Sequence, residues 1–184
     1  HNFEELGIAW LVQADFNVLT HDKQGRQFGF DTADGEIQGH VDGIITDGPV
    51  AWEYPFLWEC KSANDKKFKE FQSKGVESAN FIYYAQVLIY QAYMGLTANP
   101  ALFTVINKNT QEIYFEKVPF DAKVAQRVSD SAVNILKAVQ NNELMPRVAA
   151  KSDSFLCKWC EFRKKCWDEN DEGKKQSRLQ PSWS

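Results

Sequence analysis

The chain has 184 residues, enough for one α/β domain with a hydrophobic core but too few for such a domain joined to a motor. Hydrophobic residues make up 43% of the chain, as in a globular protein, and we read no apolar run long enough to span a bilayer. The net charge of −4 argues mildly against a nucleic-acid partner, whereas four cysteines, three of them clustered, favour a reduced, cytoplasmic compartment and a metal site over a disulfide framework.

Hydrophobic periodicity predicts helices and strands in mixed order along the first 141 residues. The expected helices are residues 1–14, 79–96 and 120–141, and the expected strands are residues 16–19, 27–31, 36–45, 56–62, 101–107 and 112–118. A polar, lysine-rich segment that Gly75 interrupts runs between the fourth strand and the second helix, to about Glu77. By itself this order predicts an α/β or α+β domain.

The most informative pattern is Asp42 followed by Glu59-Cys60-Lys61. Alternate side chains of a strand share a face, so Glu59 and Lys61 are expected to project together, and Trp58 and Cys60 to point the other way into the core. Asp42, on a neighbouring strand, brings a second carboxylate. Two carboxylates and an ammonium suit a site that holds Mg²⁺ or Mn²⁺ and activates water for attack on a phosphate. Solvated charges on an edge strand are the alternative.

These residues resemble the motifs of the PD-(D/E)XK nuclease superfamily, in the order of its RecB-like branch. Asp42 and Glu59-Cys60-Lys61 match the superfamily motif, although Val41 stands where proline is usual. Gln86 and Tyr90 match the Gln-xxx-Tyr motif of the branch, and His1 matches its upstream histidine. The resemblance implies a restriction-endonuclease-like core, in which helices flank a central mixed sheet. Within this branch, the chain is similar to the iron–sulfur exonucleases of CRISPR adaptation, of phages and of the AddB type. This similarity implies a bacterial, archaeal or phage-infected cell.

The resemblance also implies roles for individual residues. The catalytic set would be Asp42, Glu59, Lys61, Gln86 and Tyr90. The metal ligands would be His1, Asp42, Glu59 and the main-chain carbonyl of Cys60, with Mg²⁺ or Mn²⁺ as the ion. Lys61 would hold or deprotonate the attacking water and stabilise charge on the phosphate. A lone terminal histidine can also be structural or simply exposed.

Three cysteines, Cys157, Cys160 and Cys166, follow C-x₂-C-x₅-C spacing. Thiolates this close in a reduced protein favour an iron–sulfur cluster or zinc. The resemblance implies a structural four-iron, four-sulfur cluster, whereas zinc with three cysteines and one other ligand is the alternative. The fourth ligand stays open, because no cysteine precedes His1 in the sequence and Cys60 is expected in the core.

The same reading divides the chain into three parts and assigns it a partner. A nuclease core is expected at residues 1–150, a cysteine-cluster segment packing on it at 151–168, and a flexible polar tail at 169–184. DNA contacts are expected from five side chains: Lys66, Lys67, Tyr83, Lys158 and Arg163.

The sequence thus predicts a metal-dependent deoxyribonuclease, in particular an exonuclease acting on single-stranded ends in recombination and repair, phage DNA processing or CRISPR adaptation. The exonuclease preference comes from the resemblance alone. A structure-specific endonuclease on the same fold and a non-catalytic DNA-binding subunit are the alternatives, beside a plain α/β domain with a zinc knuckle. A protein partner or a homo-oligomer fits any of these, and no membrane partner is expected.

Overall fold

The computed structural model of the protein describes residues 2–167, so the tail predicted at residues 169–184 lies outside the described residues. The chain divides within one long helix into two compact units, His1–Ala132 and Val133–Ser184. The first unit contains all the strands of the described residues. The described part of the second unit, up to residue 167, contains the end of the long helix and two short helices.

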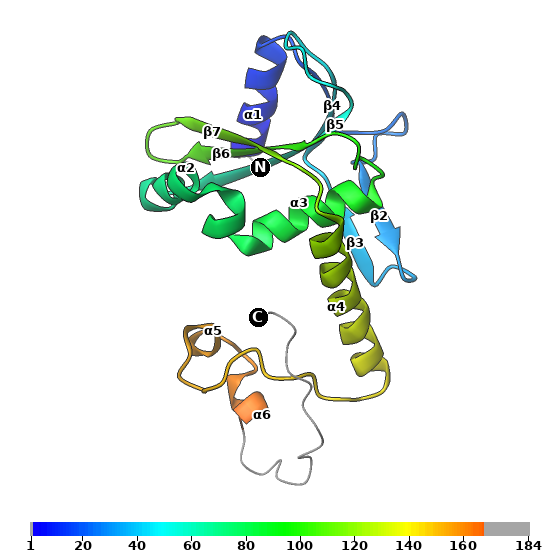
Figure 1. Cartoon of the computed structure of the whole chain (residues 1–184), viewed down its shortest axis with the longest axis vertical. Helices are drawn as coiled ribbons and strands as arrows, with labels where there is room; N and C mark the ends of the chain where they lie inside the picture. The colour runs from blue at the N-terminus through cyan, green and yellow to red at the C-terminus, as the bar shows by residue number, and fades with distance from the viewer. Residues whose placement is uncertain (1, 168–184) are drawn as a thin grey trace. The chain divides into compact units, whose positions relative to one another are not determined.

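A five-stranded mixed sheet forms the centre of the first unit (Figure 1). Its strands, in spatial order, are β1 (Asn17–Leu19), β4 (Gly43–Asp47), β5 (Phe56–Ala63), β6 (Ala101–Asn107) and β7 (Ile113–Val118). Only β5 and β6 run parallel, and the other neighbours are antiparallel. The predicted mixed sheet flanked by helices is confirmed, as an α+β fold.

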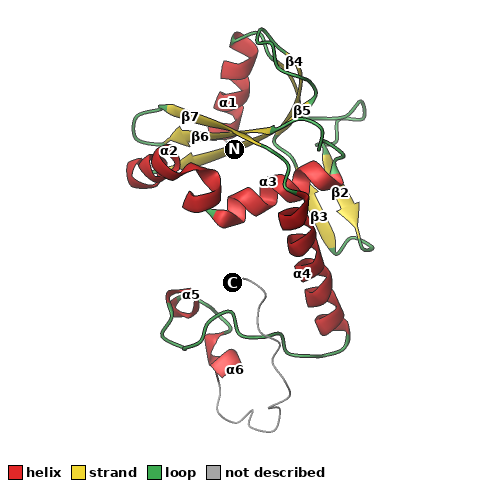
Figure 2. Ribbon diagram, in the orientation of Figure 1, coloured by secondary structure: helices red, strands yellow, loops and turns green. Residues whose placement is uncertain are grey.

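Helices cover both faces of this sheet (Figure 2). Helix α1 (Asn2–Gln13) packs on the face that carries Trp58 and Cys60. Helices α2 (Asp65–Ala79) and α3 (Phe81–Tyr93) pack on the opposite face, where Leu57 and Phe103 contribute to the larger core cluster. The buried residues of β5 and β6 therefore alternate between two apolar layers, as the period of a strand requires.

The single strand predicted at residues 36–45 is wrong. The structure has two strands there, β3 (Ile37–His40) and β4, which belong to different sheets. Strand β3 pairs with β2 (Gly29–Thr32) in a separate two-stranded sheet. The chain leaves it at Val41, whose N–H donates to the Phe28 carbonyl at 2.9 Å. Asp42 consequently lies in the connection just before β4, not inside a strand.

The lysine-rich segment forms α2, and asparagine side chains mark the starts of both helices on this face. Asn64 accepts a hydrogen bond from the Lys67 N–H, and Asn80 accepts from the N–H groups of Ile82 and Tyr83. Such caps satisfy donors that the first turn of a helix leaves unpaired. The predicted helix 79–96 therefore begins at Phe81, because Asn80 has extended backbone angles and ends α2.

The predicted helix at residues 120–141 is observed as α4 (Ala122–Gln140). In the second unit, two short helices follow, α5 (Phe155–Lys158) and α6 (Arg163–Trp167). The Arg147 Nε–H donates to the Cys166 carbonyl at 3.0 Å and so links the start of this region to its end. Within residues 2–167, none of the helices combines the length and the apolar character needed to cross a membrane.

Candidate active site

The register of β4 against β5 brings Asp42 beside Glu59. Gly43 pairs with Trp58 in this antiparallel ladder, so the residue before Gly43 lies opposite the residue after Trp58. The Asp42 carboxylate accepts a hydrogen bond from the Cys60 N–H at 2.7 Å. The approach is close at Gly43, where a Cβ atom would lie 3.0 Å from both the Trp58 ring and the Val18 side chain. A glycine at this position therefore lets Asp42 reach β5.

Glu59 is an almost completely buried carboxylate, with 1% of the residue exposed. The Lys61 ammonium donates to its Oε1, because both side chains leave β5 on the same face. Its other oxygen, Oε2, has no hydrogen-bond partner among residues 2–167. A buried charge without full pairing is costly, and such groups commonly bind metal ions. The unpartnered oxygen beside Asp42 fits a divalent cation, which prefers oxygen ligands.

Burial favours the protonated forms of both carboxylates, and for Glu59 the nearby Asp42 charge adds to this effect. Burial raises the pKa of Asp42, although the Cys60 N–H and the Lys61 charge oppose the shift. Burial, followed by the nearby Asp42 charge, raises the pKa of Glu59 to about 7. Burial acts to lower the pKa of Lys61, but the adjacent Glu59 carboxylate outweighs it and raises that pKa overall. When both carboxylates are ionised, the site carries one negative charge more than Lys61 neutralises, and a bound cation would offset that charge.

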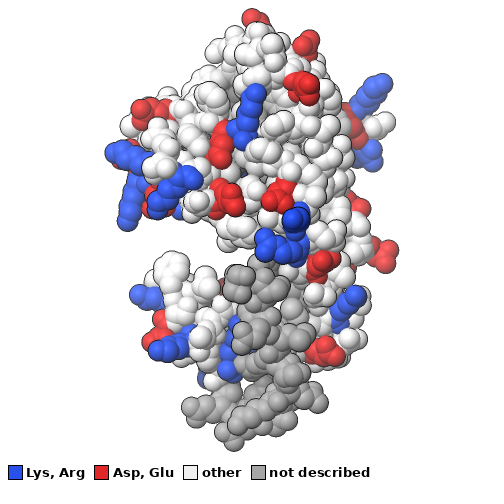
Figure 3. Space-filling model, viewed as in Figure 1, with Lys and Arg blue, Asp and Glu red and all other residues white. Residues whose placement is uncertain are grey.

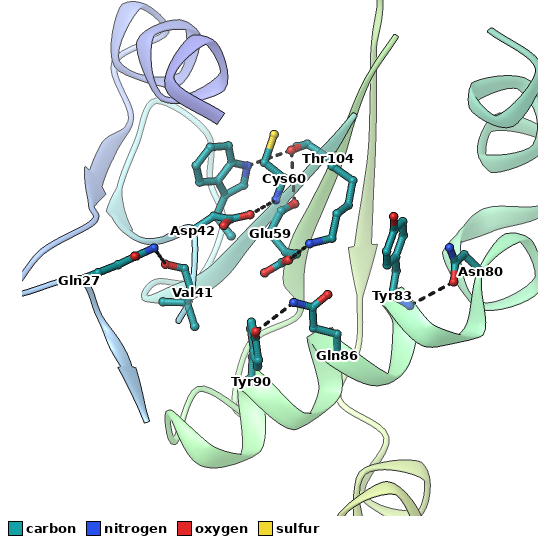
Figure 4. A network of polar contacts seen from close by, with 12 residues as sticks. Gln27, Val41, Asp42, Glu59, Cys60, Asn80, Tyr83, Gln86, Tyr90 and Thr104 are labelled. Carbon is teal, nitrogen blue, oxygen red and sulfur yellow. Dashed lines mark hydrogen bonds and ion pairs between the residues drawn. The ribbon is translucent and has the colours of Figure 1, made fainter. Parts of the chain in front are cut away.

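Helix α3 supplies a row of polar and aromatic side chains on the side of β5 that carries Glu59 (Figure 4). The Gln86 amide donates to the Tyr90 hydroxyl at 2.9 Å, as expected for side chains one helical turn apart. The Lys61 ammonium lies 5.2 Å from the centre of the Tyr83 ring, which is within the range of a cation–π contact. Tyr83 thus contacts Lys61, a role that the sequence does not predict for it.

On the opposite face of β5, the predicted core positions of Trp58 and Cys60 are confirmed. Both residues are buried in the cluster under α1. Burial raises the pKa of the Cys60 thiol to about 11, so the thiol stays protonated and poorly reactive. Thr104 accepts a hydrogen bond from the Trp58 Nε1–H at 3.1 Å. Thr104 is not among the residues predicted from the sequence, although a hydroxyl inside the otherwise apolar start of β6 is a usable signal.

The residues expected to contact DNA near this site have different surroundings. Lys66 is exposed, whereas the Lys67 ammonium donates to Glu70 at 2.8 Å and to the Ala79 carbonyl at 2.6 Å. Tyr83 also stacks on Phe71, with ring centres 6.3 Å apart and planes 10° apart. Basic side chains gather over α2, interspersed with acidic ones (Figure 3). Of these three, Lys66 has its charge directed to solvent, and Lys67 and Tyr83 also pack within the protein.

The structure brings Asp42, Glu59 and Lys61 together, and His1 lies outside the described residues. Within residues 2–167, no three His, Cys, Asp or Glu side chains gather closely enough to hold a metal ion. This holds for the cysteines of the second unit as well, where Cys157 is buried while Cys160 and Cys166 are exposed. Lys158 and Arg163, which flank these cysteines, are exposed.

Neither a known family model nor a curated protein matches the chain. Among solved structures, the chain is similar to the crystal structure of SSO0001. The sequence identity is 18% and the TM-score 0.43, and the match covers 71% of this chain. The same match covers 56% of the SSO0001 chain, so the protein spans little more than half of that chain's length. This likeness assigns neither a family nor a function.

Proposed function

We propose that the protein is a metal-dependent deoxyribonuclease with a restriction-endonuclease-like core, acting as an exonuclease on single-stranded DNA ends. The observation that carries the proposal is Glu59, a buried carboxylate that has one unpartnered oxygen and lies between Asp42 and Lys61. A purely structural ion pair would explain Lys61 and one oxygen of Glu59. It would not explain the second carboxylate, which raises the electrostatic cost of the arrangement.

In this proposal, Asp42 and Glu59 hold Mg²⁺ or Mn²⁺, with His1 and the Cys60 carbonyl as the further ligands suggested by the sequence motifs. The bound ion would supply a nucleophilic water and would neutralise charge on the phosphodiester. The Cys60 N–H fixes one oxygen of Asp42 and leaves the other free to bind. The identity of the ion rests on the donor set, because oxygen ligands favour Mg²⁺ and a histidine would favour Mn²⁺.

Lys61 is the residue that acts on the substrate in this proposal. Its ammonium donates to Glu59 in the protein alone and would donate to a phosphate oxygen when DNA is bound, holding the charge that builds up there. The Tyr83 ring keeps the ammonium near this position when the carboxylate turns to the cation. Gln86 and Tyr90 orient each other on α3 and face the same side of β5. They would therefore align the strand that is cut.

The cysteines of the second unit would hold a structural four-iron, four-sulfur cluster, or zinc in the alternative. Their thiols are soft donors that suit either group, and their spacing places three of them within ten residues. Such a group would crosslink the second unit, whose stability would then not depend on the apolar core of the first unit.

The decisive experiment measures cleavage of end-labelled single- and double-stranded DNA in Mg²⁺, Mn²⁺ or EDTA. Asp42→Ala removes a proposed ligand, and Asp34→Ala, in the exposed turn between β2 and β3, is the matched control. Metal-dependent cleavage that Asp42→Ala loses and Asp34→Ala keeps would support the proposal, and the ladder from each labelled end would give its polarity. Bound but uncut DNA would instead identify a non-catalytic binding subunit.

A further inference from the structure

The second unit exposes an unusual set of large apolar side chains in a short segment, residues 155–165, called the aromatic–basic segment below. Trp159 and Phe155 are each 79% exposed, and Phe162 is 69% exposed. Leu156 beside them is 62% exposed. Soluble proteins rarely expose several large rings within one short segment, and such patches commonly mark binding sites.

The same segment is basic, although the whole chain has a net charge of −4. It contains four cationic residues and one acidic residue, Glu161. The cations are Lys158, Arg163, Lys164 and Lys165, all exposed. Within residues 2–167 none of the four forms a salt bridge; the Lys158 ammonium lies 5.7 Å from the centre of the Trp159 ring. Rings and cations therefore occupy the same short stretch of surface.

We propose that the aromatic–basic segment binds single-stranded nucleic acid, with Trp159 and Phe162 stacking on bases and the four cations contacting phosphates. Rings and cations interspersed in one short segment match a polymer that exposes flat apolar bases beside a charged backbone. A duplex hides the faces of its bases, so rings gain nothing from it. The choice of DNA as the ligand rests on the proposed function, but the binding surface does not require a working active site.

A membrane surface also attracts apolar and basic groups, but it favours an amphipathic helix that separates the two along its length. Here α5 has four residues and α6 has five, so neither can present a long apolar face. The cations lie between and beside the rings in sequence instead of opposite them. These features favour the single strand, and vesicles of anionic lipid become an arm of the test.

The test measures fluorescence anisotropy of a labelled dT oligonucleotide and of a duplex with the full-length protein, in EDTA so that no cleavage occurs. Trp159→Ala with Phe162→Ala is expected to weaken single-strand binding about tenfold or more, the usual effect of losing base stacking. Duplex binding should change less than twofold. Phe115→Ala is the matched control, because that ring is 64% exposed on β7 of the first unit and has no such role.

Two further variants separate stacking from folding and from charge. Trp159→Phe keeps a ring and should bind within about threefold of the unchanged protein, whereas Trp159→Leu keeps bulk and apolarity and should bind as weakly as Trp159→Ala. Lys164→Gln with Lys165→Gln should weaken binding of both the single strand and the duplex. It should also reduce the salt dependence of binding, because fewer counterions are released. Thermal unfolding and bound-metal content of each variant would identify one that had lost its fold.

Equal single-strand binding by the Trp159, Phe162 and Phe115 variants would overturn the inference. So would a Trp159 and Phe162 variant that loses single-strand and duplex binding equally. Binding to anionic vesicles that depends on Trp159, without binding to dT, would assign the surface to a membrane instead. The inference and the proposed function fail separately. Metal-dependent cleavage together with unchanged binding by the Trp159 and Phe162 variants refutes only the inference. Trp159-dependent binding without any cleavage refutes only the proposed nuclease activity.

Discussion

At the scale of single residues, the candidate site depends on residue spacing within β5 and on the register of β4 against it. Glu59 and Lys61 lie two positions apart on β5, so their side chains meet without any help from the rest of the fold. Asp42 is different, because it reaches the same place only through the register of β4 and the absence of a side chain on Gly43. The Glu59–Lys61 pair and Asp42 therefore have separate structural causes and can be tested separately.

Lys61→Ala is expected to lower DNA cleavage by about 10²- to 10⁴-fold, the usual contribution of a group that transfers or stabilises a proton or charge in the transition state. DNA binding should fall only slightly, since Lys61 is one cation among many. Initial rates and equilibrium binding to the same oligonucleotide measure the two effects. Lys69→Ala is the control, because Lys69 forms only an exposed pair with Asp65 on α2. An equal loss of binding and cleavage would contradict the role proposed for Lys61.

The raised pKa of Glu59 predicts how metal binding depends on pH. A cation binds the ionised carboxylate, so below the pKa of about 7 each further pH unit should weaken apparent Mn²⁺ affinity by up to about tenfold. Above that pH the affinity should level off. Calorimetric titration with Mn²⁺ between about pH 5.5 and about pH 8.5, a range that brackets the pKa of Glu59, measures this pH dependence. An affinity that does not change across pH 7 would show that Glu59 is not a ligand.

The same shift predicts that the metal-free protein loses stability as the pH rises. The unfolded chain releases the Glu59 proton near its ordinary pKa of 4.5, but the folded protein holds it to about 7. Between these values the unfolded state binds fewer protons, so the free energy of unfolding falls, by about 3 kcal/mol in total for this group. Urea unfolding at pH 5 and pH 8 measures the difference. Glu59→Gln should remove this component, and a variant with the unchanged pH slope would contradict it.

At the scale of elements, Glu116 on β7 holds the kink of α2. Gly75 has a φ of 72°, which breaks the helix, and the next N–H, of Val76, donates to the Glu116 carboxylate at 2.8 Å. The Tyr114 hydroxyl donates to the same carboxylate at 2.8 Å. Glycine suits this backbone conformation, which other residues adopt only with strain. The sheet edge therefore fixes the end of the helix that precedes α3.

Glu116→Ala should lower the free energy of unfolding by about 1–3 kcal/mol, because it leaves the Val76 N–H and the Tyr114 hydroxyl without their shared acceptor. Chemical unfolding, followed by far-UV circular dichroism, gives the value. Glu112→Ala is the matched control, since the Glu112 carboxylate accepts only from Thr110 in the exposed turn before β7. If both variants lose the same stability, the kink does not depend on Glu116.

Local patterns predicted most of the elements, and long-range geometry accounts for the errors. The alternation in β5 was enough to place Trp58 and Cys60 in the core. The sequence predicts one strand at residues 36–45 because no change in the pattern of apolar and polar residues marks a break at Val41. Only the pairing with distant strands reveals that break. The contact of Tyr83 with Lys61 depends on where α3 crosses the sheet. No spacing in the sequence contains that information.

At the scale of the whole molecule, the chain divides into two units with different sources of stability. The first has two large apolar clusters around its sheet. Between residues 133 and 167, the second exposes Phe155, Trp159 and Phe162 and has two short helices after α4. A small unit that buries little apolar surface commonly needs a metal site or another crosslink to hold its fold. Its cysteines are therefore expected to act on stability before they act on chemistry.

Cys157→Ala should lower the yield and the melting temperature of the second unit and reduce bound iron or zinc, because Cys157 is the buried member of the trio. Cleavage per folded molecule should persist, since Asp42, Glu59 and Lys61 all belong to the first unit. Metal analysis, thermal unfolding and cleavage of a short oligonucleotide give the three readouts. Cys60→Ala is the matched control. It removes the other buried thiol, but Cys60 lies in the apolar cluster under α1 in the first unit, so bound iron or zinc should not change. A Cys157→Ala protein that is stably folded yet inactive would instead place the cysteine site in the reaction.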